Sequence, residues 1–345
     1  MLNILCLNEN FGGNWYTYKA LANAFKAVGH NFIWWHGDAN TRTPALDMQA
    51  KHPNIDIFMG ITYGLDDSIQ KAIDRWRIVN PALKVVLYGS ACGKFIDELP
   101  PEYPIVKRGE DERRRVAKCK PDLIWIHHSE RWATKTLEGW KKDGHPTAGI
   151  MNSADIIEYG NKPIIDYLKC DVGYTGGYWS FKAKTGLDKF IIPLCHPSRK
   201  LKVKIFGNTG WPVAQWMGTI QEDKVGSLFR SALVCPSVSE PHSRTHGYDP
   251  IERPFKVIAA GGFCVSDKVE TLDKDVFQGE LPMSNDPTEY IDMVEFYVKN
   301  PEKRIPIMEK CLAKVMGGHT SFHRINQLFR KVNLSNYCFD FKVKG

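Results

Sequence analysis

Four residues between positions 244 and 253 carry side chains suited to binding a charged ligand: Arg244, His246, Glu252 and Arg253. Arg253 stands at the expected start of a helix, where backbone N–H groups have no partner within the helix. Such a helix start, together with a guanidinium group, can bind a diphosphate. The same residues also fit a polar surface loop followed by a helix with an incidental arginine.

The element that would position Arg253 is a short helix leading into a buried strand. Pro254 fits the first helical turn, because its missing N–H group is not needed there. Gly261 and Gly262 fit the end of the helix, since glycine accepts the left-handed backbone of a C-cap. Residues 263–265 are apolar and typical of an inner strand of a parallel sheet. The segment therefore predicts a loop–helix–strand unit with Arg253 at the helix start.

The whole chain repeats this alternation of short apolar strands and helices. In the first half we expect a helix over residues 15–28, whose apolar positions have helical spacing, and strands over residues 2–7, 31–35, 55–61, 83–88 and 123–127. In the second half we expect strands over residues 172–174, 203–206, 233–236 and 263–265, and helices over 154–169, 287–299, 301–315 and 321–332. Gly317 and Gly318 are expected to separate the last two helices, and residues 239–249 to form a polar loop. The pattern predicts an α/β protein with two parallel sheets whose ligands bind at the carboxyl ends of the strands.

Composition limits the class of protein. A chain of 345 residues is usual for two domains, and 43% hydrophobic residues indicate a folded protein. No run approaches the ~18 apolar residues of a membrane helix, and the first residues lack the features of a signal peptide. Nine scattered cysteines without a Cys-x-x-Cys motif are typical of reduced thiols. We therefore expect a cytoplasmic protein, located in the host cytoplasm if a phage encodes it, that does not bind membranes and is a monomer.

Several segments together resemble one enzyme class. The segment around Arg253 is similar to the donor-binding element of GT-B glycosyltransferases, in particular the CgeB-like glycosyltransferases. There an arginine is followed by a glutamate, an alanine-rich stretch and a glycine before a strand. Residues 171–177 resemble the first strand and glycine turn of the nucleotide domain, and residues 203–208 with Trp211 resemble the nucleobase loop. Residues 224–235 resemble the helix and strand before the sugar-binding loop, and T-even phage DNA glucosyltransferases loosely share this order.

The resemblance implies the GT-B fold, in which two Rossmann-like domains face across a cleft and a C-terminal helix crosses back. It implies an acceptor domain over residues 1–155, a nucleotide-sugar domain over residues 156–320, and a returning helix and tail over residues 321–345. The implied activity is transfer of a hexose or pentose from a nucleotide sugar, with a UDP-sugar as co-substrate and no cofactor. Residues 273–275 match an Asp-x-Asp metal motif, but a chance match in a polar loop is the better interpretation. We expect metal-independent donor binding.

The resemblance also names the donor-binding residues. Arg253 occupies the position that binds the diphosphate, and Arg244 and His246 lie in the loop near the donor sugar. The family glutamate that binds the ribose hydroxyls is replaced by Lys256. Two alternatives are open: Glu252, one helical turn earlier, substitutes for it, or the donor is held differently. The other predicted donor-binding residues lie in the turns that approach the donor, including the turn that forms the nucleobase slot. They are Gly12, Gly13, Gly176, Gly177, Phe206, Gly207 and Asn208.

The catalytic base is predicted only from its position at a strand end in the first domain. His127 follows the strand at residues 123–127, and a histidine accepts a proton near neutral pH. Asp111 follows the apolar residues 104–106. We retain both as candidates, because each type of side chain at such a place is also common as a surface or capping residue.

The expected acceptor is a hydroxymethylated pyrimidine in double-stranded DNA. The loose phage resemblance and the net charge of +7 favour this acceptor. A surface polysaccharide, another glycan or a protein is an open alternative, because aromatic residues also suit carbohydrates. A second alternative is a nucleotide-binding protein without catalysis, which the replacement of the family glutamate by Lys256 would suit. A Rossmann-type oxidoreductase is disfavoured, because its glycine fingerprint is missing.

Overall fold

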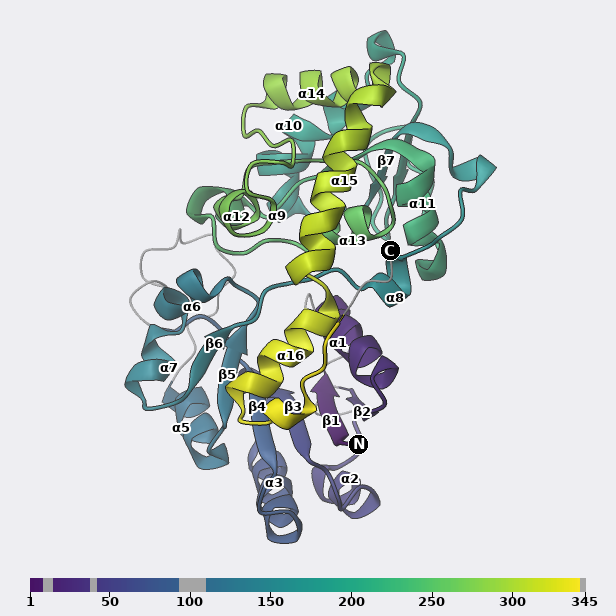
Figure 1. Cartoon of the computed structure of the whole chain (residues 1–345). Helices are drawn as coiled ribbons and strands as arrows, with labels where there is room; N and C mark the ends of the chain where they lie inside the picture. The colour runs from purple at the N-terminus through teal and green to yellow at the C-terminus, as the bar shows by residue number, and fades with distance from the viewer. Residues whose placement is uncertain (9–14, 38–41, 93–109, 342–345) are drawn as a thin grey trace. The chain divides into compact units, whose positions relative to one another are not determined.

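The computed structural model describes residues 1–8, 15–37, 42–92 and 110–341 of the chain (Figure 1). Contacts divide these residues into two compact units. Unit 1 contains Met1–Met151 and the C-terminal segment that begins at Phe322, and unit 2 contains Asn152–Ser321. The predicted donor positions Gly12 and Gly13 lie outside the described residues.

Unit 1 is built on a parallel six-stranded sheet of order β2-β1-β3-β4-β5-β6. Strand β1, next to the edge strand β2, pairs with β2 and β3, so that Cys6 lies opposite Trp34 on one side and Met59 on the other. Most residues of the inner strands are buried, as expected for a parallel sheet covered on both faces. The strands are β1 (Asn3–Asn8), β2 (Asn31–His36), β3 (Ile57–Ile61), β4 (Lys84–Tyr88), β5 (Leu123–Ile126) and β6 (Thr147–Gly149).

The helices of unit 1 place an apolar face on this sheet. In α1 the buried residues Tyr18, Leu21, Ala22 and Phe25 recur at the spacing that the sequence predicts. Helix α3 begins after Asp66, whose side chain accepts a hydrogen bond from the Ile69 backbone N–H and so caps the helix. The helices described in this unit before its C-terminal segment are α1 (Trp15–Ala27), α2 (Ala45–Lys51), α3 (Asp67–Val79), α5 (Glu110–Cys119), α6 (Glu130–Thr136) and α7 (Glu138–Lys142).

The C-terminal helix α16 (Ser321–Lys331) packs on unit 1 (Figure 1). Gln327 donates a hydrogen bond to the backbone oxygen of Gly149, and the Lys331 ammonium lies 2.8 Å from a carboxylate oxygen of Glu130. The ring of Phe329, which is fully buried, packs edge to face on that of Phe25. The last helix is therefore part of the core of the first unit.

Unit 2 contains a parallel four-stranded sheet of order β10-β9-β7-β8. Its strands are β7 (Cys170–Thr175), β8 (Val203–Phe206), β9 (Ala232–Ser237) and β10 (Cys264–Ser266). A buried tyrosine joins two of them, because the Tyr290 hydroxyl lies 3.1 Å from the backbone oxygens of both Ser237 and Val265. Burial raises the pKa of Tyr290 well above its usual value, so the group stays a neutral hydroxyl.

The helices of unit 2 include the predicted element at Arg253, which is α13 (Arg253–Ala259). Gly261 follows it with φ of +74°, the left-handed conformation that the sequence predicts for its end. The other helices are α8 (Ile156–Tyr159), α9 (Ser180–Lys182), α10 (Asp188–Phe190), α11 (Val225–Ser231), α12 (Pro241–His246), α14 (Pro287–Lys299) and α15 (Pro301–Gly318), with π-helical segments at Ala183–Leu187 and Thr271–Phe277.

Three sequence predictions of local structure are wrong. Residues 154–169 are helical only over Ile156–Tyr159 and in a 3-10 turn at Asp166–Leu168, because Gly160 and Pro163 interrupt the segment. The expected loop at residues 239–249 contains α12, in which Pro241 takes the first helical position and Gly247 ends the helix with φ of +76°. Gly317 and Gly318 belong to α15, and the break follows at His319.

Within the described ranges, no helix has both the length and the apolar character needed to cross a membrane.

Candidate functional site

Arg253 lies at the carboxyl end of strand β7 in unit 2. Its Nη2 donates a hydrogen bond of 2.8 Å to the backbone oxygen of Thr175, the last residue of that strand. The guanidinium carbon lies 4.5 Å from the centre of the Tyr174 ring, a cation–π contact. The Nη1 atom is buried and has no hydrogen-bond partner among the described residues. The side chain is therefore held in place while part of its donor capacity is unused, which is unusual for a buried group.

The glycine turn after β7 lies beside Arg253 and against the loop after β8. A Cβ atom at Gly176 would lie 2.9 Å from Arg253 Nη2, and Gly176 itself has φ of +155°. A Cβ atom at Gly207 would lie 2.2 Å from the backbone oxygen of Gly176. Only glycine fits at Gly207, because a side chain would displace the backbone of the neighbouring turn. The predicted positions in these two turns are thus brought together.

Hydrogen bonds fix these two turns to each other. Trp211 Nε1 donates to the Gly176 oxygen over 3.0 Å, and the Tyr178 N–H donates to Thr209 Oγ1 over 2.5 Å. Asn208 is exposed at the tip of the same loop, whereas Phe206 is buried. Thr209 belongs to this cluster although the sequence pattern did not predict it. Its position two residues after Gly207, in a loop that follows an apolar strand, is the signal that would have found it.

Arg244 is held by a different set of contacts at the ends of β9 and β10. Its Nη1 lies 2.6 Å from the Ser239 backbone oxygen and 3.2 Å from a carboxylate oxygen of Asp267, and Nη2 donates to the Thr185 backbone oxygen. Asp267 is fully buried and also accepts hydrogen bonds from the backbone N–H and hydroxyl of Ser239. This predicted donor-binding arginine therefore neutralises a buried carboxylate.

Histidines of α12 pack around a buried tyrosine. His242 Nε2 lies 2.9 Å from a carboxylate oxygen of Asp249, and its ring is 5.8 Å from that of Tyr248. The predicted donor residue His246 lies on the same helix, with its ring 6.1 Å from Tyr248. The three aromatic rings form one cluster, so His246 is fixed by packing.

The two residues considered for the ribose position differ in their surroundings. The Lys256 ammonium lies 5.5 Å from the centre of the Tyr159 ring of α8, a second cation–π contact. Glu252 is the residue before the first turn of α13, and it is half-buried. Within the described part of the chain, no hydrogen bond or ion pair engages the Glu252 carboxylate. An acidic group therefore lies one residue from Arg253 without a structural partner.

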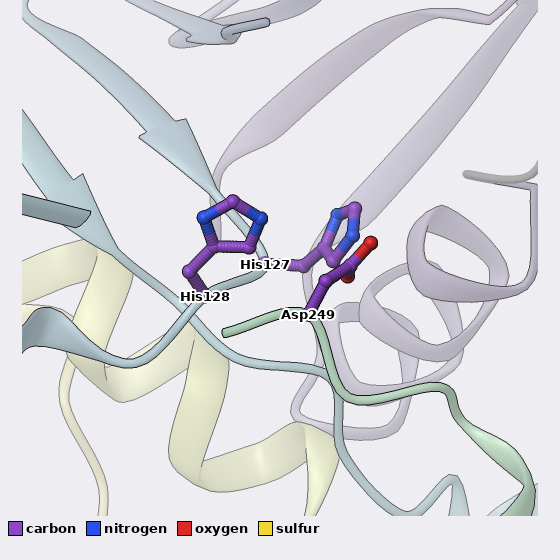
Figure 2. Close-up of side chains that lie close together, drawn as sticks. All are labelled: His127, His128 and Asp249. Atoms are coloured by element: carbon purple, nitrogen blue, oxygen red, sulfur yellow. The ribbon is translucent and has the colours of Figure 1, made fainter. Parts of the chain in front are cut away.

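In unit 1, the predicted base His127 follows strand β5 directly. Its Nδ1 is hydrogen-bonded to the Tyr88 hydroxyl, and the two rings stack with their centres 5.3 Å apart. The next residue, His128, is buried, and its Nδ1 lies 3.0 Å from Thr136 Oγ1. Figure 2 shows the two imidazole rings on consecutive residues just beyond the strand; Asp249, also drawn there, belongs to unit 2.

Asp111, the other predicted base, lies on the exposed surface of α5. Its carboxylate oxygen is 2.8 Å from Arg114 Nη2, and both side chains are mostly exposed to solvent. The Asp-x-Asp segment lies in the π-helical segment Thr271–Phe277, where Asp273 pairs with Lys268 over 3.3 Å. Both arrangements are those of ordinary surface ion pairs.

Comparisons with known proteins agree on one fold. A family model described as glycosyl transferase-like matches residues 189–330. No curated protein matches the chain in sequence. An α-glucosyltransferase in complex with UDP-glucose and DNA containing an abasic site is similar in structure, with a TM-score of 0.64, 11% identity and coverage of 96% of this chain and 99% of that chain.

Two other solved structures are similar over comparable lengths. Sucrose-phosphate synthase from Thermosynechococcus elongatus has a TM-score of 0.62 at 11% identity, and covers 96% of this chain and 99% of its own. HepE from Anabaena, in complex with UDP-glucose, has a TM-score of 0.57 at 12% identity, and the match covers 96% of this chain and 100% of HepE. The predicted α/β GT-B fold is thereby confirmed, and residues 189–330 are similar to the family described as glycosyl transferase-like. The CgeB-like subfamily is not confirmed.

Proposed function

We propose that this protein is a glycosyltransferase that takes its sugar from a UDP-sugar. The observation that carries the proposal is Arg253, fixed at the carboxyl edge of the unit 2 sheet with a buried, unpartnered Nη1. The family-model match includes this residue, and solved structures of the same fold hold UDP-glucose. A diphosphate oxygen is the kind of acceptor that a guanidinium donor binds most strongly.

The same edge offers a place for the nucleoside. The turns at Gly176 and Gly207 let backbone approach a flat ring closely, because neither carries a Cβ atom. Glu252 has a carboxylate without a structural partner, and a carboxylate can accept hydrogen bonds from both ribose hydroxyls. Lys256 is engaged with Tyr159. We therefore assign the ribose to Glu252, which replaces the family glutamate.

Transfer also needs a base that removes the proton of the acceptor hydroxyl. We propose His127 for this role, since Asp111 is exposed and paired with Arg114. The Tyr88 hydroxyl fixes the orientation of the His127 ring. For Nε2 to accept a proton, Nδ1 must carry the hydrogen and donate it to Tyr88. His127→Gln should then lower the transfer rate about 100-fold or more while UDP affinity stays unchanged.

For the acceptor, we propose a hydroxymethylated pyrimidine in double-stranded DNA. The net charge of +7 and the likeness to an α-glucosyltransferase bound to DNA support this choice. A carbohydrate acceptor is the second candidate, because sucrose-phosphate synthase is similar to nearly the same degree. Incubation with UDP-glucose and either hydroxymethylated DNA, unmodified DNA or free sugars separates them. Mass spectrometry of the products should show a hexose added only to the hydroxymethylated DNA.

The donor site is tested by calorimetric titration with UDP, UDP-glucose, GDP-mannose and NAD. We expect selective binding of UDP and UDP-glucose. Arg253→Ala should weaken UDP binding about 10- to 100-fold, because it removes hydrogen bonds to a charged group. Arg253→Lys keeps the charge but loses the planar fork, and should be intermediate. The exposed Lys303→Ala is the control and should bind UDP normally.

Two results would contradict the proposal. Unchanged UDP affinity in folded Arg253→Ala would remove Arg253 from the donor site. Tight UDP-sugar binding without hydrolysis or transfer to any acceptor would instead indicate a nucleotide-binding protein without catalysis. Thermal unfolding of each variant shows whether a loss of binding reflects a loss of folded protein.

A further inference from the structure

A large cavity lies at the amino ends of the strands in the unit 2 sheet. Its volume is about 810 Å³, and residues at or just before the strand starts line it, including Cys170, Lys202, Ala232 and Phe263. Arg253, by contrast, contacts the carboxyl end of β7. The cavity is therefore separate from the proposed donor site, and the function proposed above does not use it.

Cationic side chains outnumber carboxylates in the lining of this cavity. They are Lys169, Lys202, Arg230 and Arg304, against the two carboxylates of Asp171 and Glu302. Lys169 is already paired with Asp166 outside the cavity. Lys202 and Arg230 are exposed, and the described part of the chain provides no hydrogen bond or ion pair to either side-chain cation. These cations are available to an anion without loss of an existing contact.

Arg304 joins the lining of the cavity to the sheet. Its Nη1 donates a hydrogen bond to the backbone oxygen of Leu233 in β9, whereas its Nε is buried without a partner in the described residues. Burial lowers the pKa of Arg304, since the charged form loses hydration. Asp171 accepts a hydrogen bond from the Lys202 backbone N–H over 2.7 Å, so this carboxylate has a structural use.

Apolar residues also line the cavity, which continues into a second hollow. This hollow measures about 230 Å³ and shares Gly261, Gly262, Ile305 and Met308 with the first. It adds Ile258, Glu309 and Leu312. Three large apolar side chains around the two hollows are unusually exposed: Ile164 is 56% exposed, Ile305 58% and Leu312 39%. A cluster of exposed apolar side chains beside unpaired cations favours a ligand that covers both.

We propose that this cavity binds an amphiphilic anion, namely a phosphate monoester or carboxylate that carries an aliphatic chain. The anionic group would contact Lys202, Arg230 and Arg304, and the chain would lie along Ile305, Met308 and Leu312. Burial of the apolar surface and pairing of the cations then both contribute to the binding free energy. Neither half of the ligand alone binds as tightly as the whole.

The test is calorimetric titration of the full chain with octyl phosphate below its micelle concentration, with inorganic phosphate and octanol as its two halves. We expect octyl phosphate to bind at least tenfold more tightly than either half. The double variant Lys202→Gln/Arg230→Gln and the single variant Ile305→Asn should each weaken octyl phosphate binding at least fivefold. Lys303 is an exposed lysine on α15, the helix of Ile305, and does not line the cavity. Lys303→Gln is therefore the matched control and should leave the affinity for octyl phosphate unchanged.

Sedimentation with vesicles distinguishes the source of the ligand. Co-sedimentation with phosphatidic acid vesicles that is lost in Lys202→Gln/Arg230→Gln would identify a membrane lipid, and octyl phosphate binding without co-sedimentation a free amphiphile. Equal affinity for inorganic phosphate and octyl phosphate, or unchanged affinity in all variants, would overturn the proposal. UDP binding should be normal in every cavity variant, so failure here and failure of the proposed function give different results.

Discussion

Arg244 and Arg253 are both predicted from the sequence to bind the donor, but they have different surroundings in the fold. Arg253 uses one amino group on the Thr175 backbone oxygen and leaves the other without a partner. Arg244 uses both on the chain itself and lies against the buried Asp267 carboxylate. A guanidinium with spare donors suits a ligand, whereas one that neutralises a buried charge suits the fold. We therefore assign donor binding to Arg253 first.

Replacing Arg244 tests its structural role. Arg244→Ala leaves the fully buried Asp267 carboxylate without its cation, and removal of one partner of such a pair typically costs about 3 kcal/mol or more. Urea denaturation should show this loss, and Asp267→Asn in the same chain should restore part of the free energy of unfolding. A stable Arg244→Ala protein with weakened UDP binding would show instead that Arg244 belongs to the donor site.

The ribose assignment of Glu252 is tested with an altered ligand. In the unaltered protein, UDP lacking both ribose hydroxyls should bind about 10-fold or more weakly than UDP, because hydrogen bonds to a carboxylate are lost. In Glu252→Gln that difference should shrink, whereas in Lys256→Gln it should persist. Calorimetry of the three proteins with both ligands forms a double-mutant cycle. A persistent difference in Glu252→Gln would exclude this residue as the ribose ligand.

At the scale of elements, a glycine stabilises the end of helix α13, whereas a glycine destabilises helix α15. Gly261 ends α13 with φ of +74°, whereas Gly317 lies within α15, and a Cβ atom at either would meet nothing within 4 Å. Gly261→Ala should lower the free energy of unfolding by about 1 kcal/mol, because alanine is strained in this conformation. Gly317→Ala should raise it by roughly 0.5–1 kcal/mol through helix propensity. Equal effects in urea denaturation would contradict this argument.

Local signals predict some of these elements well. Pro254 and Gly261 bracket α13, and apolar spacing over residues 15–28 predicts the buried face of α1, since both depend on neighbours in the chain. Residues 239–249 are harder, because their polar composition hides a helix whose Arg244 is bonded to Asp267 and to the Thr185 backbone oxygen. Such contacts join distant segments, and no local pattern contains them.

The candidate site shows the same limit. Strand ends place Arg253, Gly176 and Gly207 at one edge of a parallel sheet, so their proximity is predictable from the order of elements. The partner of Arg244 cannot be predicted in this way, because its buried ion pair with Asp267 depends on the side-chain packing between α12 and the end of β10. The available donor of Arg253 likewise becomes evident only when its other contacts are known.

At the scale of the whole molecule, a histidine links the first sheet to the C-terminal segment. The His30 ring packs against Phe329 of α16 and against Tyr337, and its Nδ1 accepts a hydrogen bond from the Leu2 backbone N–H. Burial, together with the N-terminal amino group, lowers the pKa of His30. The neutral ring is therefore the form that the folded protein favours.

Acid should consequently weaken unit 1 through His30. As the pH is lowered below about 6.5, the unfolded chain takes up a proton at this residue before the folded chain does. The free energy of unfolding therefore decreases as the pH is lowered, until the pKa of His30 in the folded protein is passed. We expect the melting temperature to fall less between pH 7.5 and pH 5 in His30→Gln than in the unaltered protein. The other histidines with lowered pKa values, such as His36 and His145, titrate in both proteins. Identical pH dependence in both would contradict this role.

The return of α16 to unit 1 affects the order in which the chain can fold during synthesis. Among the described residues, unit 2 is one continuous segment, Asn152–Ser321, whereas unit 1 takes Ile325, Leu328 and Phe329 into its core from beyond that segment. A ribosome makes residues 1–151 before unit 2, but these core residues only after it. The second unit can therefore complete its fold first, whereas unit 1 lacks three core residues until α16 has been made.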